Sequence, residues 1–192
     1  MDADGEDNPN EIKKMLKEAI KYENCVVTSN RKKRKESLLV VFLYRIHLLI
    51  TFIFTLKWIS FGNFTTFSSK NIIKLLSNNS SWYAHSSSVL NNCNIKKVYA
   101  KREKRYFDKS KLNLLALMEH SLRVNAVFFP RILANSLVYS MIIFWTIKTL
   151  YLNYIFIFLI LSFNIFIFFI KKKHYIKDFS LTKNLIDSIK LP

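Results

Sequence analysis

The sequence predicts an all-α membrane protein with two transmembrane helices. Two apolar runs carry this prediction, at residues 38–56 and at residues 150–170, and the second holds 21 residues without a charge before three consecutive lysines. A helix of that length is about 30 Å long, which matches the hydrocarbon core of a bilayer. Only two glycines and three prolines occur among 192 residues, so tight turns are expected to be scarce.

Residues 1–36 are expected to form a cytosolic tail with a short amphipathic helix. Asn8, Pro9 and Glu11 supply a cap, a first helical proline and an acid in the first turn. The apolar stripe of this helix consists of Ile12, Met15, Leu16, Ala19 and Ile20. A helix this short is marginal alone, so it needs a surface to fold against. Packing within the chain is slightly favoured over binding of a partner or a bilayer surface.

The first transmembrane segment is assigned to residues 37–61, around the apolar run at 38–56. A basic juxtamembrane cluster at residues 31–35 directly precedes it, as is typical of the cytosolic end of a span. Acidic residues occupy the first positions of the chain, so this run is expected to serve as a signal anchor. Arg45 and His47 weaken the span, and Arg45 is expected to snorkel toward the cytosolic phosphates.

Residues 62–125 are predicted to be a polar and basic loop in the lumen. Three N-x-S/T triplets start in it, at Asn63, Asn78 and Asn79. Asn78 and Asn79 lie far enough beyond residue 56 to accept a glycan, whereas Asn63 is too close to the membrane. Further along, a helical face is predicted from the spacing of Leu112, Leu115, Met118 and Leu122.

The segment at residues 126–149 is predicted to be interfacial or re-entrant. Its uninterrupted part, residues 132–147, gives about 24 Å of helix, which is short of a full crossing. Only Lys148 and Thr149 separate it from the last run, without a glycine or proline to reverse the chain. A tight hairpin of two spans is therefore not expected at this point.

The last transmembrane helix is predicted at residues 150–170, with a basic cytosolic tail at 171–192. Asn153 and Asn164 are eleven residues apart and share one face of this helix. An amide in hydrocarbon needs a partner, so the pair predicts a helix-helix interface, with a membrane-protein partner as one candidate. The alternative is chance, because Asn is abundant throughout the chain.

Flanking charges predict that both termini are cytosolic. Six bases precede the first run and three follow it within twenty residues, whereas two precede the last run and six follow it. The positive-inside bias then requires an even number of crossings, and two is the chosen number. A chain with three crossings remains the main alternative.

No catalytic or cofactor motif is present in the sequence. The four histidines and two cysteines lack metal-ligand spacing, and two glycines cannot build a phosphate-binding loop. Neither an enzyme nor a cofactor is therefore expected. The formal charge of +17 suits anionic lipid head groups, while the apolar runs argue against nucleic acid as the partner.

The leading hypothesis is a non-enzymatic association or scaffold component of an endomembrane such as the endoplasmic reticulum. One alternative is a small accessory subunit of a transporter or translocation complex, in which Arg45, Asn135 and Lys148 would line a polar path. Another is an unselected product without a defined function. The sequence does not identify the partner.

Overall fold

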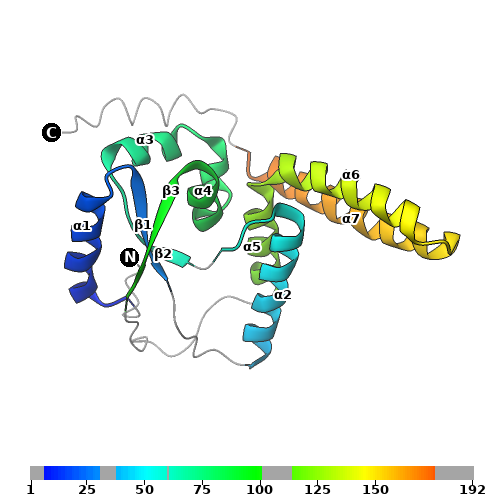
Figure 1. Cartoon of the computed structure of the whole chain (residues 1–192), viewed down its shortest axis with the longest axis horizontal. Coiled ribbons are helices and arrows are strands. Elements are labelled where there is room, and N and C mark those ends of the chain that lie inside the picture. The colour runs from blue at the N-terminus through cyan, green and yellow to red at the C-terminus, as the bar shows by residue number, and fades with distance from the viewer. Residues whose placement is uncertain (1–6, 31–37, 60, 101–113, 176–192) are drawn as a thin grey trace.

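The computed structural model describes residues 7–30, 38–59, 61–100 and 114–175. The basic cluster at 31–35 and most of the basic tail at 171–192 therefore lie outside the described residues. Figure 1 shows a small sheet with helices on both sides, and a group of longer helices beside it. The elements are η1 (Pro9–Glu11), α1 (Ile12–Lys21), β1 (Cys25–Asn30), α2 (Leu38–Thr55), β2 (Phe61–Thr66), α3 (Ser69–Leu76), η2 (Asn79–Trp82), α4 (His85–Asn92), β3 (Asn94–Tyr99), α5 (Leu114–Ala126), α6 (Phe129–Thr146) and α7 (Leu150–Lys173).

The fold is mostly helical, but a three-stranded sheet corrects the prediction of an all-α protein. The strand order is β2-β1-β3, with β1 antiparallel to β2 and parallel to β3. The strands are only six residues long, and β3 carries two lysines, so they read as polar tail and loop in the sequence. Val26, Val27 and Thr28 are β-branched and suit the central strand.

The sheet is covered on both faces, because successive side chains of β1 point in opposite directions. Val27 packs with Met15 of α1, Phe64 and Val98, while Val26 packs on the other face with Leu75 and Val89. Figure 1 shows α1 on one side and α3 with α4 on the other. We call this unit, from η1 to β3 without α2, the sheet domain.

The predicted cap at Asn8 starts the 3-10 helix η1, and α1 follows at Ile12 without a side-chain cap of its own. The side chain of Asn8 accepts a hydrogen bond of 2.8 Å from the backbone nitrogen of Asn10, and Pro9 follows it. Part of the apolar stripe packs within the chain, because Met15 is fully buried against the sheet and Ile12 and Ala19 are partly buried. Leu16 and Ile20 are exposed, so binding of a partner by this helix stays a prediction for those two residues.

Helices α6 and α7 form an antiparallel hairpin that projects away from the sheet domain (Figure 1). The chain thus reverses tightly at a point where no tight hairpin of two spans was expected, although of these two helices only α7 is by itself long and apolar enough to be a span. Ile147 and Thr149 take extended backbone conformations, and Asn153 donates through Nδ2 to the carbonyl oxygen of Ile147 at 2.8 Å. A side-chain amide thus supports a reversal that has no glycine or proline.

One helix in the described part of the chain, α7, is long and apolar enough to span a membrane. Helices α5 and α6 make a second such stretch only when taken together, and they are bent by 86° at their junction. The apolar part of α2, Val41–Thr55, is shorter. The predicted span at 150–170 thus has a matching helix, whereas two transmembrane helices at 38–56 and 150–170 are not confirmed.

The pairing of the strands before and after α2 means that both ends of this helix connect to the same sheet. Strand β1 precedes this helix and β2 follows it, and Asn30 is the Cα partner of Phe61. The chain therefore leaves the sheet, forms α2 and returns to the same sheet. A membrane crossing at residues 37–61 would separate β1 from β2 and β3, so the predicted division of residues 1–36 and 62–125 between two sides is not compatible with this fold.

Candidate functional site

The outer face of α2 is apolar except for the exposed Arg45, and its inner face contains both polar and apolar residues. The apolar residues of the outer face are each at least one-third exposed; they are Phe42, Ile46, Leu49, Ile50 and Ile53. Thr51 and Thr55 are fully buried on the inner face, beside His47 and Leu48. Leu48 and Phe54 also pack inward, so α2 has apolar residues on both faces, unlike a typical water-soluble surface helix, which keeps its apolar side against the protein.

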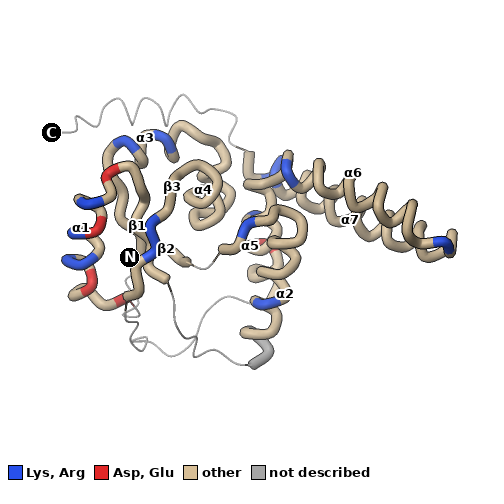
Figure 2. The backbone as a smooth tube through the Cα atoms, viewed as in Figure 1, with Lys and Arg blue, Asp and Glu red and all other residues tan. Residues whose placement is uncertain are grey.

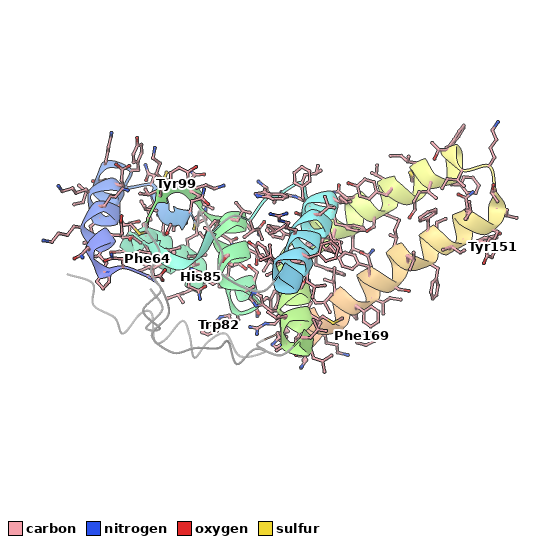
Figure 3. All side chains as sticks on the ribbon, turned by 90° about the horizontal axis from the view of Figure 1, so that it is seen from below. Phe64, Trp82, His85, Tyr99, Tyr151 and Phe169 are labelled. Atoms are coloured by element: carbon pink, nitrogen blue, oxygen red, sulfur yellow. The ribbon has the colours of Figure 1, made fainter. Side chains whose placement is uncertain are left out.

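The helical hairpin of α6 and α7 also has an apolar exposed surface, while its interior combines polar residues with the fully buried Ile132 and Ile167. Ser136, Asn153 and Asn164 are buried, while Trp145 is 86% exposed and Phe158 is 68% exposed. Figure 3 shows the side chains along both helices pointing outward, with Tyr151 at the far end and Phe169 near the base. Less than a quarter of the most apolar part of α7 is buried within the chain, whereas a core helix of a globular domain is mostly buried.

The amide of Asn164 connects the two helices of the hairpin. Its Nδ2 donates to Ser136 Oγ at 2.9 Å and to the carbonyl oxygen of Ile160 at 2.8 Å. Asn153 supports the turn, so both residues of the predicted helix-helix interface face α6 of their own chain.

Three donors from α6 meet the carboxyl end of α2. Arg131, Asn135 and Tyr139, which we call the polar row, are spaced four residues apart and lie on one face of α6. They donate to three consecutive carbonyl oxygens: Arg131 to Thr55 at 3.5 Å, Asn135 to Phe54 at 2.8 Å and Tyr139 to Ile53. These carbonyls belong to the last turn of a helix, where intrahelical donors are missing.

Leu56 ends α2 and turns the chain. Its φ angle is 54°, in the left-handed region that leucine rarely occupies, and its nitrogen donates to the carbonyl oxygen of Phe52 at 2.7 Å. A leucine in this conformation costs roughly 1 kcal/mol relative to glycine. The surrounding contacts hold this turn, which sends the chain back toward β2.

Charged groups lie at the two ends of the hairpin and not between them (Figure 2). At the base, Glu119 of α5 accepts from Lys173 Nζ and from His174 Nε2, both at 2.9 Å. The hydrogen bonds from Lys173 and His174 hold the pKa of the Glu119 carboxyl below its usual value. Lys148 occupies the turn at the opposite end.

The structure does not bring together the residues that were expected to line a polar path. Arg45 is exposed on α2, Asn135 is bonded to the end of that helix, and Lys148 lies at the hairpin turn. Among the described residues no group of three or more His, Cys, Asp or Glu side chains is arranged to hold a metal ion. His47 instead contacts Ser121 Oγ at 2.6 Å and so joins α2 to α5.

The predicted glycan acceptors lie in the sheet domain. Asn78 accepts from the backbone nitrogen of Ser80 and begins η2, and its Nδ2 donates to Asn92 Oδ1 at 2.9 Å. Asn79 is half-buried in the first turn of η2. The nitrogen of Asn78 that would carry a glycan is therefore already engaged in the fold.

Sequence reasoning missed the polar row as a unit. Asn135 was a candidate polar residue in the sequence, but no connection with Arg131 or Tyr139 was predicted. The spacing of four between Arg131, Asn135 and Tyr139 was the available signal, since it places three donors on one helix face. Their target was not visible, because backbone carbonyls of a distant helix leave no pattern in the sequence.

No protein-family model matches the chain, and no curated protein or solved structure is significantly similar to it.

Proposed function

We propose that the chain is a non-enzymatic, membrane-anchored association module: the hairpin of α6 and α7 inserts into an endomembrane and holds the sheet domain at its cytosolic face. The observation that carries this proposal is the apolar outer surface of the hairpin, where phenylalanines are exposed although Asn153 and Asn164 are buried in the interior together with Ile167. Buried amides surrounded by exposed aromatic and aliphatic residues suit hydrocarbon as the solvent.

The dimensions of the hairpin support insertion. The 18 residues of α6 extend about 27 Å, and the charge-free residues 150–170 of α7 extend about 30 Å. Trp145, Tyr151 and Tyr154 are exposed at the turn end, where amphipathic rings would meet the far interface. The lysines at 171–173 would then meet the head groups on the side of the sheet domain.

The topology within this proposal differs from the one expected from the sequence. The hairpin enters and leaves on one side, so the sheet domain and the base of α7 share that side. Positive charge at the base favours the cytosol, which retains the expectation of cytosolic termini. Asn78 and Asn79 would then be cytosolic together with β1, and no glycan is expected on them.

The surface offered to a partner would be α1. Leu16 and Ile20 are exposed on this helix, which otherwise packs on the sheet through Met15. Two exposed apolar residues beside Lys13 and Lys17 fit a peptide or a helix with apolar and acidic groups. Association through α1 while the hairpin anchors the chain is the scaffold activity that we propose.

Alkaline extraction of membranes tests the anchor. A double variant, Phe158→Arg with Leu161→Arg, places two charges on exposed positions of α7 and is expected to move the protein into the supernatant. The matched control is Leu16→Arg with Ile20→Arg, which places the same charges on exposed apolar positions of α1. Retention of the α7 variant in the pellet would contradict the proposal.

A further inference from the structure

We infer that the outer face of α2, together with Trp58, contacts lipid in the leaflet next to the sheet domain, so that the chain is embedded through three helices and not through the hairpin alone. This inference rests on the proposed insertion of α6 and α7. It assigns a lipid-binding role to a helix that does not itself cross the membrane.

The position of α2 along the hairpin sets its depth. The last turn of α2 is bonded to Arg131, Asn135 and Tyr139, which lie in the first eleven residues of the 18-residue helix α6. At 1.5 Å per residue, the polar row covers about 12 Å of α6 from near its base. The carboxyl end of α2 therefore lies beside the half of the hairpin that is nearest to the sheet domain.

The donors from α6 to the last carbonyl groups of α2 indicate a dry environment at this end of α2. In water, the carbonyl groups of a final helical turn can bond to solvent, and no dedicated side chains are needed. In hydrocarbon, each unpaired carbonyl is costly, so a helix that ends there requires donors from neighbouring segments. A side chain of α6 donates a hydrogen bond to each of the carbonyl oxygens of Ile53, Phe54 and Thr55, as expected of a helix that ends within a leaflet.

The outer face of α2 is continuous with this end. Ile53 belongs to both the outer face and the capped turn. Trp58 stacks edge-on against Phe52, an exposed residue beside this face, with ring centroids 6.0 Å apart. The inner face carries Thr51 and Thr55, both fully buried. A bilayer therefore covers the apolar side of α2 in the same way as it covers the apolar side of α7.

The charges on α2 fit a location near the head groups. Arg45 is exposed on the outer side, two turns before Ile53, and Lys57 follows the last turn. Both long side chains can extend their charged groups to phosphate while their aliphatic parts remain among acyl chains. A tryptophan at position 58 also suits the interface between head groups and hydrocarbon.

The three tryptophans of the chain allow a direct test. Trp58 reports on α2, Trp145 on the hairpin and Trp82 on the sheet domain, and all three are more than one-third exposed. Three variants each retain one tryptophan, with the other two replaced by phenylalanine, and the full chain is reconstituted in phosphatidylcholine vesicles with or without brominated acyl chains. Bromine quenches only a tryptophan that contacts the lipid.

The expected result is that Trp58 and Trp145 each lose at least half of their fluorescence in brominated lipid, with Trp58 more sensitive to bromine near the head groups than to bromine near the chain ends. Trp82 should lose almost none. If Trp145 is quenched and Trp58 behaves like Trp82, the inference is wrong although the proposed anchor holds. If neither Trp58 nor Trp145 is quenched, both the inference and the proposed function fail.

Discussion

The sheet domain and the helical hairpin place apolar residues in opposite locations. In the sheet domain, Met15, Val26 and Val27 are fully buried, whereas the lysines that α1 carries (Figure 2) are exposed. In the hairpin, Asn164 is buried and Phe158 is 68% exposed. The same preference of apolar groups for apolar surroundings explains both regions if the sheet domain is in water and the hairpin in lipid.

The comparison also shows what holds each region together. The sheet domain has apolar clusters on both faces of β1, and their burial supplies the main favourable term in water. Between helices in lipid that term is absent, because lipid chains are as apolar as leucine. Contacts such as Asn164 with Ser136, and the polar row with α2, would then contribute more of the stability.

The largest expected effect is a charge in the core of the sheet domain. Val27→Asp places a carboxylate between α1 and the sheet, at a position with no exposed surface, and should cost at least about 4 kcal/mol of folding free energy. Limited proteolysis should then cleave the domain rapidly. Phe158→Asp is the control on the hairpin, where the sheet domain should remain resistant; equal protection of both variants would contradict the division into two regions.

A smaller effect is expected from removing an apolar contact on the same face. Met15→Ala should lower the free energy of unfolding of the sheet domain by about 2–5 kcal/mol, because it leaves a cavity beside Val27, Phe64 and Val98. Leu16→Ala changes an exposed neighbour and should change stability by less than about 0.5 kcal/mol. Denaturant titration of the detergent-solubilised protein measures both, and similar losses would show that α1 does not pack as described.

A still smaller effect is expected when the amide of Asn164 in the hairpin is replaced. Asn164→Leu keeps a similar volume but removes the donor to Ser136, and should weaken the contact of α6 with α7 by about 0.6–2 kcal/mol. The partner variant Ser136→Ala and the double variant complete a cycle that isolates the pair. Unfolding in mixed micelles gives the coupling energy between Asn164 and Ser136. A coupling energy of zero would mean that this hydrogen bond does not stabilise the hairpin.

The smallest effect concerns pH at the base of the hairpin. Lys173 and His174 hold the pKa of Glu119 below its ordinary value, so this carboxylate stabilises the fold above that ordinary value and loses the contribution as pH falls through the lowered pKa. Because the site is exposed, the change should be slight. Thermal denaturation across the acidic range should show a weaker pH dependence for Glu119→Gln; an unchanged profile would mean that the contact does not contribute.

Several helices were predictable because their signals are local. The cap at Asn8, the stripe that includes Met15, and the charge-free run at residues 150–170 each depend on neighbouring residues in the sequence. Asn153 and Asn164 were also recognised as one face, because eleven residues return a helix to the same direction.

The strands and the contacts between distant helices were not predictable in the same way. Strand β3 contains Lys96 and Lys97, and its pairing with β1 involves residues about seventy positions away. The turn at Lys148 lacks the usual residues and depends on the side chain of Asn153. These features arise from tertiary contacts, which periodicity in one segment cannot reveal.

The most direct test of the account uses the two native cysteines, one on each side of α2 in the sequence. Cys25 begins β1 and is the Cα partner of Asn94, so it lies at the same end of the sheet as Cys93. Variants that retain only one cysteine are treated with a membrane-impermeant maleimide in sealed microsomes. The extent of labelling is divided by the extent reached after detergent is added, because burial raises the pKa of Cys93 and so lowers its reactivity. The account predicts that both cysteines are labelled to similar extents before detergent is added. Labelling of Cys25 alone, with Cys93 protected until the membrane is opened, would contradict it.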